Sequence, residues 1–425
     1  MKFKVNKSSL SGTIPIPGSK SHTIRALAFA LLARGESLIE RPLFSTDTES
    51  CLSMIQQLGA KVKKEGDNWR VTGTGGKILV PDDVIDVGNS GTSLYIGIGL
   101  AALADGSTVF TGDHQIRSRP SQNLLLAINH LGGNAFSTRK NGKPPVVVSG
   151  PIAGGGTTLE AVTSQYLSSL LIALPCAPRD SVIDVTKLNE QPYVDMTMAW
   201  MEKLGVYCEN RDYRQFLIKG GQRYRSFSEA IPADFSAAVF FMSAAAITGS
   251  ELVLEGLDYN DSQGDREVAN ILKKMGADVK VDKRRTVIKG KKLTGGVFDL
   301  NDIPDSLPSL AVAACFAEGE TRLVNVPQAR LKETDRISVM CAELSKLGAD
   351  IQELPDGLVI KGKSSGLSGG RVNGHYDHRV VMALAVGGLA CEGGLEVDTA
   401  EASAITFPDF FDLMKTAGAD ITKEE

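Results

Sequence analysis

Hydrophobic and polar positions repeat along this chain with a long and regular period. A helical pattern that ends in a glycine turn and continues as a strand occurs six times, with turn glycines Gly59, Gly132, Gly205, Gly276, Gly348 and Gly418. Successive glycines lie 73, 73, 71, 72 and 70 residues apart, which indicates an internal repeat. A glycine just past the last helical turn is typical of a left-handed helix cap. Each repeat therefore combines helix and strand.

Each repeat also contains a second helix of a different kind. The runs at 25–40, 237–255 and 307–324 begin with helices that are apolar on nearly all sides and continue into β-rich segments. Such helices are expected inside a domain. The helix expected over 265–277 is amphipathic and should lie nearer solvent. The pattern predicts an α/β (α+β) fold. A solenoid is the alternative, although solenoid repeats are usually about 20 to 50 residues long.

The six repeats divide naturally into two groups of three. A boundary is expected at 226–234, between the third and fourth repeats, and a Pro/Gly stretch at 14–19 precedes the first full repeat. If the first strand belongs with the later repeats, the chain crosses between domains twice. The expected domains are 1–14 with 232–425, and 19–226, with crossings at 15–18 and 227–231. Because ligands favour clefts between domains, we expect the active site in the interdomain cleft.

Composition and charge argue against several classes of protein. The 46 basic and 50 acidic residues give a net charge of −4, and aromatic residues make up 6%, so no nucleic-acid partner is expected. The most apolar stretch, 94–104, is too short to cross a membrane, and residues 1–10 contain no apolar signal segment. The six cysteines lack metal-ligand or redox spacing. We therefore expect a cytoplasmic protein without a membrane partner.

Cations, hydroxyls and amides gather where apolar helices are expected to begin. The segments are 17–25, 88–92, 117–120, 163–165, 332–336 and 376–379. A cation at a helix N-terminus opposes the helix dipole unless an anion binds there. Each segment alone is typical of a protein surface. Because such segments recur at equivalent positions of the repeats, we predict that they form a single anion pocket.

These segments carry a family resemblance that covers essentially the whole chain. The motifs are PGSKS (17–21) followed by RAL (25–27), GNSGT (88–92), RP (119–120), TSQ (163–165), PD (304–305), LKETDR (331–336), DHR (377–379) and FPDFF (407–411). With them the sequence resembles the enolpyruvyl transferase family, in particular the branch that acts on shikimate-3-phosphate. The resemblance implies two similar domains, each of three βαβαββ-type units with buried helices. It also implies a monomer without metal or organic cofactor.

The activity implied by the resemblance is transfer of the carboxyvinyl group of phosphoenolpyruvate to the 5-hydroxyl of shikimate-3-phosphate, a step toward aromatic amino acids. The implied catalytic residues are Asp305, which accepts the hydroxyl proton, Glu333 and Lys20. The implied acceptor-binding residues are Lys20, Ser21, Arg25, Thr163, Ser164, Gln165, Asp305, Gln328 and Lys332. The implied phosphoenolpyruvate-binding residues are Lys20, Asn89, Gly91, Arg119, Gln165, Arg336 and Arg379.

The sequence departs from the family pattern at four positions. Tyr95 and Ile405 stand where cations are common, Glu190 stands where a serine is common, and Gln328 replaces an asparagine. One alternative is therefore a diverged enolpyruvyl transferase with another, non-phosphorylated cyclic alcohol as acceptor. The branch that uses a UDP-aminosugar is disfavoured because 112–120 contains no cysteine. A non-catalytic ligand-binding protein is the remaining alternative.

Overall fold

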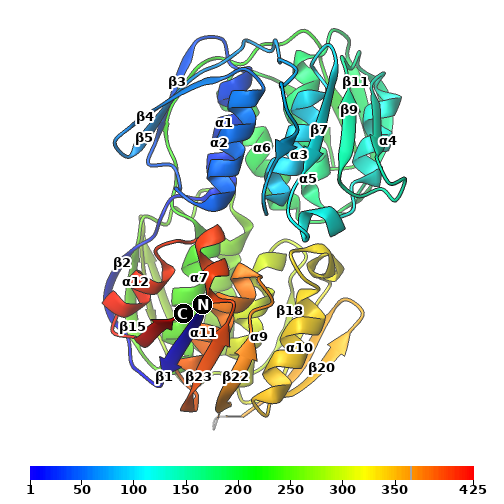
Figure 1. Ribbon diagram of the computed structural model, residues 1–425. Helices are drawn as coiled ribbons and strands as arrows, with labels where there is room; N and C mark the ends of the chain where they lie inside the picture. The colour runs from blue at the N-terminus through cyan, green and yellow to red at the C-terminus, as the bar shows by residue number, and fades with distance from the viewer. Residues whose placement is uncertain (364–365) are drawn as a thin grey trace. The chain divides into compact units, whose positions relative to one another are not determined.

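The chain divides into two compact units. The computed structural model describes residues 1–363 and 366–425. Unit 1 comprises Met1–Pro17 and Pro232–Glu425, and unit 2 comprises Gly18–Ile231. The chain therefore passes from one unit to the other after Pro17 and again after Ile231 (Figure 1). Residues 228–230, which were expected in a crossing, form a strand of unit 2.

Every described sheet has four strands in the same order, a parallel pair followed by two antiparallel strands. In five of these sheets the last two strands form a hairpin, and in the sixth they are β1 and β24, from opposite ends of the chain. Unit 2 contains β14(Ser228–Ala230)-β3(Glu36–Glu40)-β5(Asn68–Thr72)-β4(Lys61–Glu65), β6(Ile85–Asp86)-β7(Ser107–Thr111)-β9(Val146–Ser149)-β8(Asn134–Ser137) and β10(Gly155–Ala161)-β11(Ser181–Leu188)-β13(Gln215–Ile218)-β12(Cys208–Arg211). Unit 1 contains β2(Ser11–Pro15)-β15(Glu251–Glu255)-β17(Arg285–Lys289)-β16(Asp278–Asp282), β18(Val297–Asp299)-β19(Gly319–Val324)-β21(Gly357–Gly362)-β20(Asp350–Leu354) and β22(Ser368–Asn373)-β23(Glu392–Asp398)-β1(Lys2–Asn6)-β24(Asp420–Glu424).

Two classes of helix connect these strands. The inner helices, almost wholly buried, are α1 (Lys20–Leu32), α3 (Gly91–Ala101) and α5 (Ser164–Ala173) in unit 2, and α7 (Phe235–Thr248), α9 (Leu307–Cys315) and α11 (His378–Gly388) in unit 1. The outer, amphipathic helices are α2 (Thr46–Gln57), α4 (Gln122–His130), α6 (Gln191–Lys203), α8 (Glu267–Met275), α10 (Arg336–Lys346) and α12 (Phe410–Thr416). Short 3-10 turns are η1 (Ile116–Ser118), η2 (Leu174–Cys176), η3 (Gly264–Arg266), η4 (Pro304–Ser306), η5 (Pro327–Leu331) and η6 (Ala400–Ile405).

The predicted repeat is confirmed in its local geometry. All six turn glycines have a positive φ, between 80° and 117°, which side chains with a Cβ rarely adopt. Three sheets are completed by segments far away in sequence. β1 pairs with β23 and β24, so the N-terminal strand lies among strands of the last repeat (Figure 1). Likewise β2 opens the fourth repeat beside β15, and β14 opens the first beside β3.

Each unit has its own hydrophobic core, built on its three inner helices. In α1 every residue from His22 to Leu32 is buried, and in α7 every residue from Phe235 to Ala246 is buried. A helix that is apolar on all sides can place polar groups only at its ends without leaving them buried and unpaired. Polar groups that can meet a ligand are therefore expected mainly near the ends of these helices. The predicted α/β (α+β) class with two similar domains is confirmed.

The structure also describes the cysteines and the apolar segments of the sequence. All six cysteines are free thiols, and burial raises the pKa of Cys51 and Cys315 to about 12, so these thiols are inert at neutral pH. Within the described residues, no helix combines the length and the apolar character that a membrane span requires.

Candidate functional site

In unit 2 most of the predicted residues lie at the N-terminal ends of the three inner helices. Side chains of Ser19, Ser90 and Thr163 cap α1, α3 and α5 by accepting hydrogen bonds from backbone amides. The first residues of these helices are Lys20, Gly91 and Ser164, all of them predicted site residues. Helix N-termini carry partial positive charge and present amide donors, so this end of each helix favours an anion.

Lys20 has a partner that the sequence analysis missed. Its Nζ lies 3.0 Å from Oδ2 of Asp47, whose side chain is only 3% exposed. Asp47 is in the first turn of α2, between Ser45 and Thr48, which form the capping box of this helix. An acidic residue in a first helical turn is common for dipole reasons alone, so the sequence offered no signal of this contact. Asp47 holds the Lys20 ammonium group in position.

Arg119 packs against the start of α3. A Cβ added at Gly91 would lie 2.7 Å from Nη1 of Arg119, so glycine is what permits this close approach. The carbonyl of the next residue, Pro120, accepts hydrogen bonds from the hydroxyls of Tyr95 (2.8 Å) and Tyr166 (2.6 Å). Tyr95, which replaces an expected cation, therefore anchors the chain beside Arg119.

Asn89 and Gln165 present buried acceptors in the same region of unit 2. The amide nitrogen of Asn89 donates to Oδ2 of Asp113 (2.6 Å) and Oε1 of Gln115 (2.5 Å), both of which precede Arg119 in the chain. Among the described residues, Asn89 Oδ1 and Gln165 Oε1 are buried without a hydrogen-bond partner. Buried polar atoms are almost always paired, so these two oxygens are suited to a bound ligand.

Arg25 is fully buried between α1, α5 and α6. It donates to Thr197 Oγ1 (2.9 Å), Ser168 Oγ (3.3 Å) and the carbonyls of Tyr193 (2.9 Å) and Ser21 (3.1 Å). Burial lowers the pKa of Arg25 to about 10, against the opposing influence of Tyr193 and Glu190, so the guanidinium stays charged at neutral pH. Four of its five N–H groups are used within the protein, which leaves one Nη1 donor for a ligand.

The Glu190 side chain accepts hydrogen bonds from two predicted residues of unit 2, Thr163 and Ser164. Its Oε2 accepts hydrogen bonds from Thr163 Oγ1 (2.9 Å), Ser164 Oγ (2.9 Å) and the Ser164 amide (3.2 Å). Glu190 departs from the family pattern in sequence, and the structure places its carboxylate at the start of α5.

In unit 1 the predicted residues surround the carboxylate of Asp305. Its oxygens lie 2.8 Å from Arg336 Nη1, 3.3 Å from Arg379 Nη2 and 3.7 Å from Lys332 Nζ. Asp305 lies on η4, immediately before α9, while Arg336 begins α10 and Arg379 lies in the first turn of α11. The structure thus brings together four predicted residues from the fifth and sixth repeats, both in unit 1.

Arg336 is the centre of a second set of ion pairs. Its side chain is 1% exposed and is bidentate with Asp377, at 2.8 Å and 3.1 Å, and its Nη2 lies 2.6 Å from Glu333 Oε2. Burial by itself would lower the pKa of Arg336, but the carboxylates of Asp377, Glu333 and Asp305 outweigh it and raise the pKa above its ordinary value. These contacts use four of the five N–H groups of Arg336, which leaves one Nη1 donor for a ligand carboxylate.

Asp265 in unit 1 is a buried acidic residue that the sequence analysis missed. It receives hydrogen bonds of 2.5 Å from Ser236 Oγ and Ser306 Oγ, the latter next to Asp305. Burial raises its pKa, Arg379 opposes this increase and Asp305 adds to it. Its position on η3, just before the outer helix α8, gave no sign that it would contact residues at the inner helices.

Gln328 and Ile405 are two of the positions at which the sequence departs from the family pattern, and both lie in unit 1. Gln328 is buried on η5 and donates to the carbonyl of Asn301 at 2.8 Å, while its Oε1 has no partner among the described residues. Ile405, at the end of η6, packs against the core of unit 1. A position where a cation was expected thus contributes to packing.

Glu333, Asp377 and His378 place potential metal-ligand atoms within 4.8 Å of one another. Both carboxylates already bind the Arg336 guanidinium, so a metal ion would compete with a buried cation for the same oxygens. The donor set thus fits an arginine-centred ion-pair network better than a metal site.

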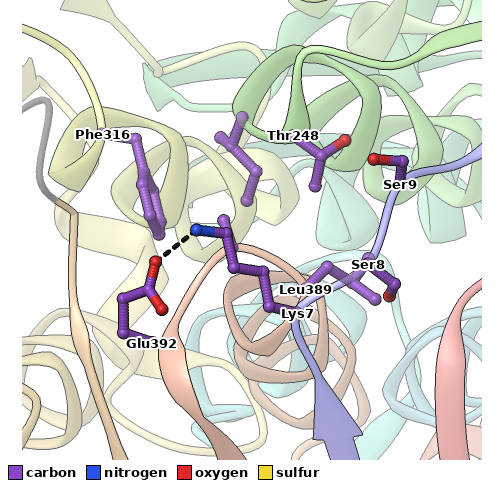
Figure 2. Close-up of a pocket in the computed structure, with 9 residues that line it drawn as sticks. Lys7, Ser8, Ser9, Thr248, Phe316, Leu389 and Glu392 are labelled. Atoms are coloured by element: carbon purple, nitrogen blue, oxygen red, sulfur yellow. Dashed lines mark hydrogen bonds and ion pairs between the residues drawn. The ribbon is translucent and has the colours of Figure 1, made fainter.

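A separate pocket lies at the opposite ends of the inner helices of unit 1. It has a volume of about 520 Å³ and is lined by residues that end or follow α7, α9 and α11, including Thr248, Phe316 and Leu389. Figure 2 shows Lys7 reaching across it to Glu392. None of the predicted site residues lines this pocket, and Asp305 and Arg379 lie at the opposite, N-terminal ends of α9 and α11.

Proteins of known function resemble this chain along its whole length. The family model for EPSP synthase (3-phosphoshikimate 1-carboxyvinyltransferase) matches residues 5–414. A 3-phosphoshikimate 1-carboxyvinyltransferase of Acetivibrio thermocellus is 58% identical over 422 residues, which cover 99% of both chains. Another from Ruminiclostridium cellulolyticum is 55% identical over 421 residues, again 99% of both.

A solved structure resembles the chain equally completely. EPSP synthase from Acinetobacter baumannii superimposes with a TM-score of 0.84 at 26% identity, covering 100% of both chains. Fold and sequence together define an enolpyruvyl transferase, so the resemblance found in the sequence is confirmed. Within that class, the chain belongs to the EPSP synthase (3-phosphoshikimate 1-carboxyvinyltransferase) family.

Proposed function

We propose that this protein transfers the carboxyvinyl group of phosphoenolpyruvate to the 5-hydroxyl of shikimate-3-phosphate and releases phosphate. The observation that carries the proposal is 58% identity, over 99% of both chains, to a relative named for this activity. The chemistry agrees with the site residues. Both substrates are polyanions, and each unit offers three cations, namely Lys20, Arg25 and Arg119 in unit 2 and Lys332, Arg336 and Arg379 in unit 1.

The reaction proceeds by addition and elimination. The acceptor oxygen forms a bond to C2 of phosphoenolpyruvate and loses its proton, while C3 gains a proton. C3 then loses a proton, the bond from C2 to the phosphate oxygen breaks, and the carbon–carbon double bond re-forms. The protein must therefore supply a proton acceptor for the hydroxyl, a proton carrier for C3 and fixed positive charge for the leaving phosphate.

Asp305 is the group that we assign to the hydroxyl proton. Three cations surround its carboxylate, and a carboxylate is a group that can accept the proton of a hydroxyl. Glu333, bound to Arg336, is the second proton carrier, and Lys20, bound to Asp47, serves the phosphate and the acceptor. These assignments require no metal or organic cofactor.

The binding roles follow from the charge of each substrate group. For phosphoenolpyruvate, Lys20, Asn89, Gly91, Arg119 and Gln165 hold the phosphate, and Arg336 and Arg379 hold the carboxylate. For the acceptor, Ser21 and Arg25 bind the carboxylate and Thr163 and Ser164 face the phosphate. Lys332 and Gln328 complete the acceptor contacts around its ring.

The proposal is tested by incubating the purified protein with phosphoenolpyruvate and shikimate-3-phosphate. We expect phosphate release that requires both substrates, together with one equivalent of an enolpyruvyl ether detected by mass spectrometry. Shikimate and other unphosphorylated cyclic alcohols form the second arm of the assay. Turnover with one of these and none with shikimate-3-phosphate would reject the proposed acceptor, and no turnover with any alcohol would reject the transferase activity.

Replacing Gly91 by alanine is expected to raise the KM for phosphoenolpyruvate about tenfold or more. The new Cβ would lie 2.7 Å from Arg119 Nη1, so the guanidinium must move away from its proposed contact with the phosphate, and loss of one charged hydrogen bond costs about 1.5–3 kcal/mol. The KM for the acceptor should change less. Steady-state kinetics with each substrate varied in turn checks the prediction. The control is Gly156→Ala, because a Cβ there has no neighbour within 4 Å. Equal effects of both variants would contradict it.

A further inference from the structure

The start of α5 forms a site for an anion, and the protein itself fills it. Three donors, the hydroxyls of Thr163 and Ser164 and the Ser164 amide, all point to one oxygen, Oε2 of Glu190. Glu190 is 1% exposed. Hydroxyl and amide donors at a helix N-terminus are the arrangement that binds phosphate and carboxylate groups. The carboxylate therefore occupies the position that an external anion would take.

The chain places this carboxylate at a cost in free energy. Glu190 directly precedes α6 and has left-handed backbone angles, φ 61° and ψ 44°, which are unfavourable for a residue with a Cβ. A residue at that position commonly caps its own helix, but the Glu190 side chain makes no capping hydrogen bond to α6. It reaches to α5 instead. A strained backbone held in this way indicates a side chain that serves the site.

The charge balance of this region includes Glu190. Arg25, buried beside α5 and α6, interacts electrostatically with Glu190 and donates to Ser168 on α5 and Thr197 on α6. If a second anion arrived at the same donors, it would meet the Glu190 carboxylate at short range in a buried setting. Like charges in such a setting repel strongly. One of the two anions must therefore leave the donors.

We propose that Glu190 determines acceptor specificity by acting as the built-in occupant of the subsite for the acceptor phosphate. The inference rests on the proposed function, in which Thr163 and Ser164 face that phosphate. A phosphorylated acceptor binds only by displacing the Glu190 carboxylate from the three donors, and this displacement lowers its affinity. An acceptor with a hydroxyl in place of the phosphate does not have to displace Glu190 from these donors, because the hydroxyl can itself donate a hydrogen bond to the carboxylate.

The test compares Glu190→Ser and Glu190→Gln with the wild type on two acceptors, shikimate-3-phosphate and shikimate. For Glu190→Ser we expect kcat/KM for shikimate-3-phosphate to rise about tenfold, the scale of one charged hydrogen bond, with no rise for shikimate. The KM for phosphoenolpyruvate should stay within about twofold, as for a contact made only with the acceptor. Glu190→Gln, which keeps the side-chain volume without the charge, should give a smaller gain of the same sign. Calorimetric titration with shikimate-3-phosphate should show a correspondingly lower Kd, that is, tighter binding.

The controls separate the possible failures. Asp184→Asn removes the carboxylate of an exposed residue on β11 of the same unit, which accepts a hydrogen bond from Gln215. This variant should leave kcat/KM unchanged for both acceptors. Wild-type protein that does not turn over shikimate-3-phosphate would reject the proposed function itself. Wild-type turnover combined with unchanged or weaker shikimate-3-phosphate binding in both variants would overturn the role of Glu190 alone. Equal gains on both acceptors would also overturn it. If Glu190→Ser does not fold, as judged by circular dichroism, Glu190→Gln decides the outcome.

Discussion

Replacing Asp305 by asparagine is expected to lower kcat by about 10²- to 10⁴-fold, the usual contribution of a general base. Asparagine matches aspartate in shape but cannot accept the hydroxyl proton. The three cations around Asp305 would lose a carboxylate partner, so they should bind phosphoenolpyruvate at least as well as before. The expected signature is therefore a large fall in kcat with a KM for phosphoenolpyruvate that is unchanged or lower.

Steady-state kinetics and a phosphate-release assay check this prediction. Asp299→Asn is the matched control, because Asp299 is exposed on β18 and accepts hydrogen bonds from the Asn301 amide and the Asn325 side chain. Its kcat should remain within about twofold of the wild type, as is usual for a surface substitution away from the site. A kcat for Asp305→Asn within tenfold of the wild type would show that another group accepts the proton.

Replacing Asp377 by asparagine is expected to lower the free energy of unfolding of unit 1 by about 3–5 kcal/mol, the range measured when one partner of a buried ion pair is removed. Asp377 is fully buried and is bidentate with Arg336, which is also buried. Asparagine caps a helix as well as aspartate does, so the start of α11 stays capped and the effect reports the missing charge.

Urea denaturation followed by circular dichroism measures this loss. Both tryptophans, Trp69 and Trp200, belong to unit 2, so their fluorescence shows whether unit 2 unfolds with unit 1 or independently. The control is Asp398→Asn, which breaks an exposed bidentate pair with Arg371. Exposed pairs contribute about 0–1 kcal/mol, so this variant should unfold near the wild type. An equal decrease in the free energy of unfolding in the two variants would mean that the buried Asp377 pair stabilises the protein no more than an exposed pair does.

The predicted site residues differ in what the structure adds to them. Lys332, Arg336 and Arg379 were expected from their motifs, and the structure gathers them on Asp305. The contact of Lys20 with Asp47 could not be predicted, because acidic residues begin many helices for dipole reasons alone. Tyr95 was noted only as a missing cation, yet its hydroxyl anchors Pro120 beside Arg119. The motifs identify residue types, and the folded chain decides which of them pair.

The sequence by itself determined the repeat, the inner and outer helices and the helix ends at which the chemistry lies. These features depend on local patterns, namely apolar periodicity and a glycine after each outer helix, which act within one or two helical turns. Only the tertiary structure decided that β1 completes the sheet of the last repeat and that Glu190 fills the anion site of α5. Such contacts join residues from 26 to more than 390 positions apart. Their free energy depends on burial and on the charges of groups brought together by folding, which no local pattern records.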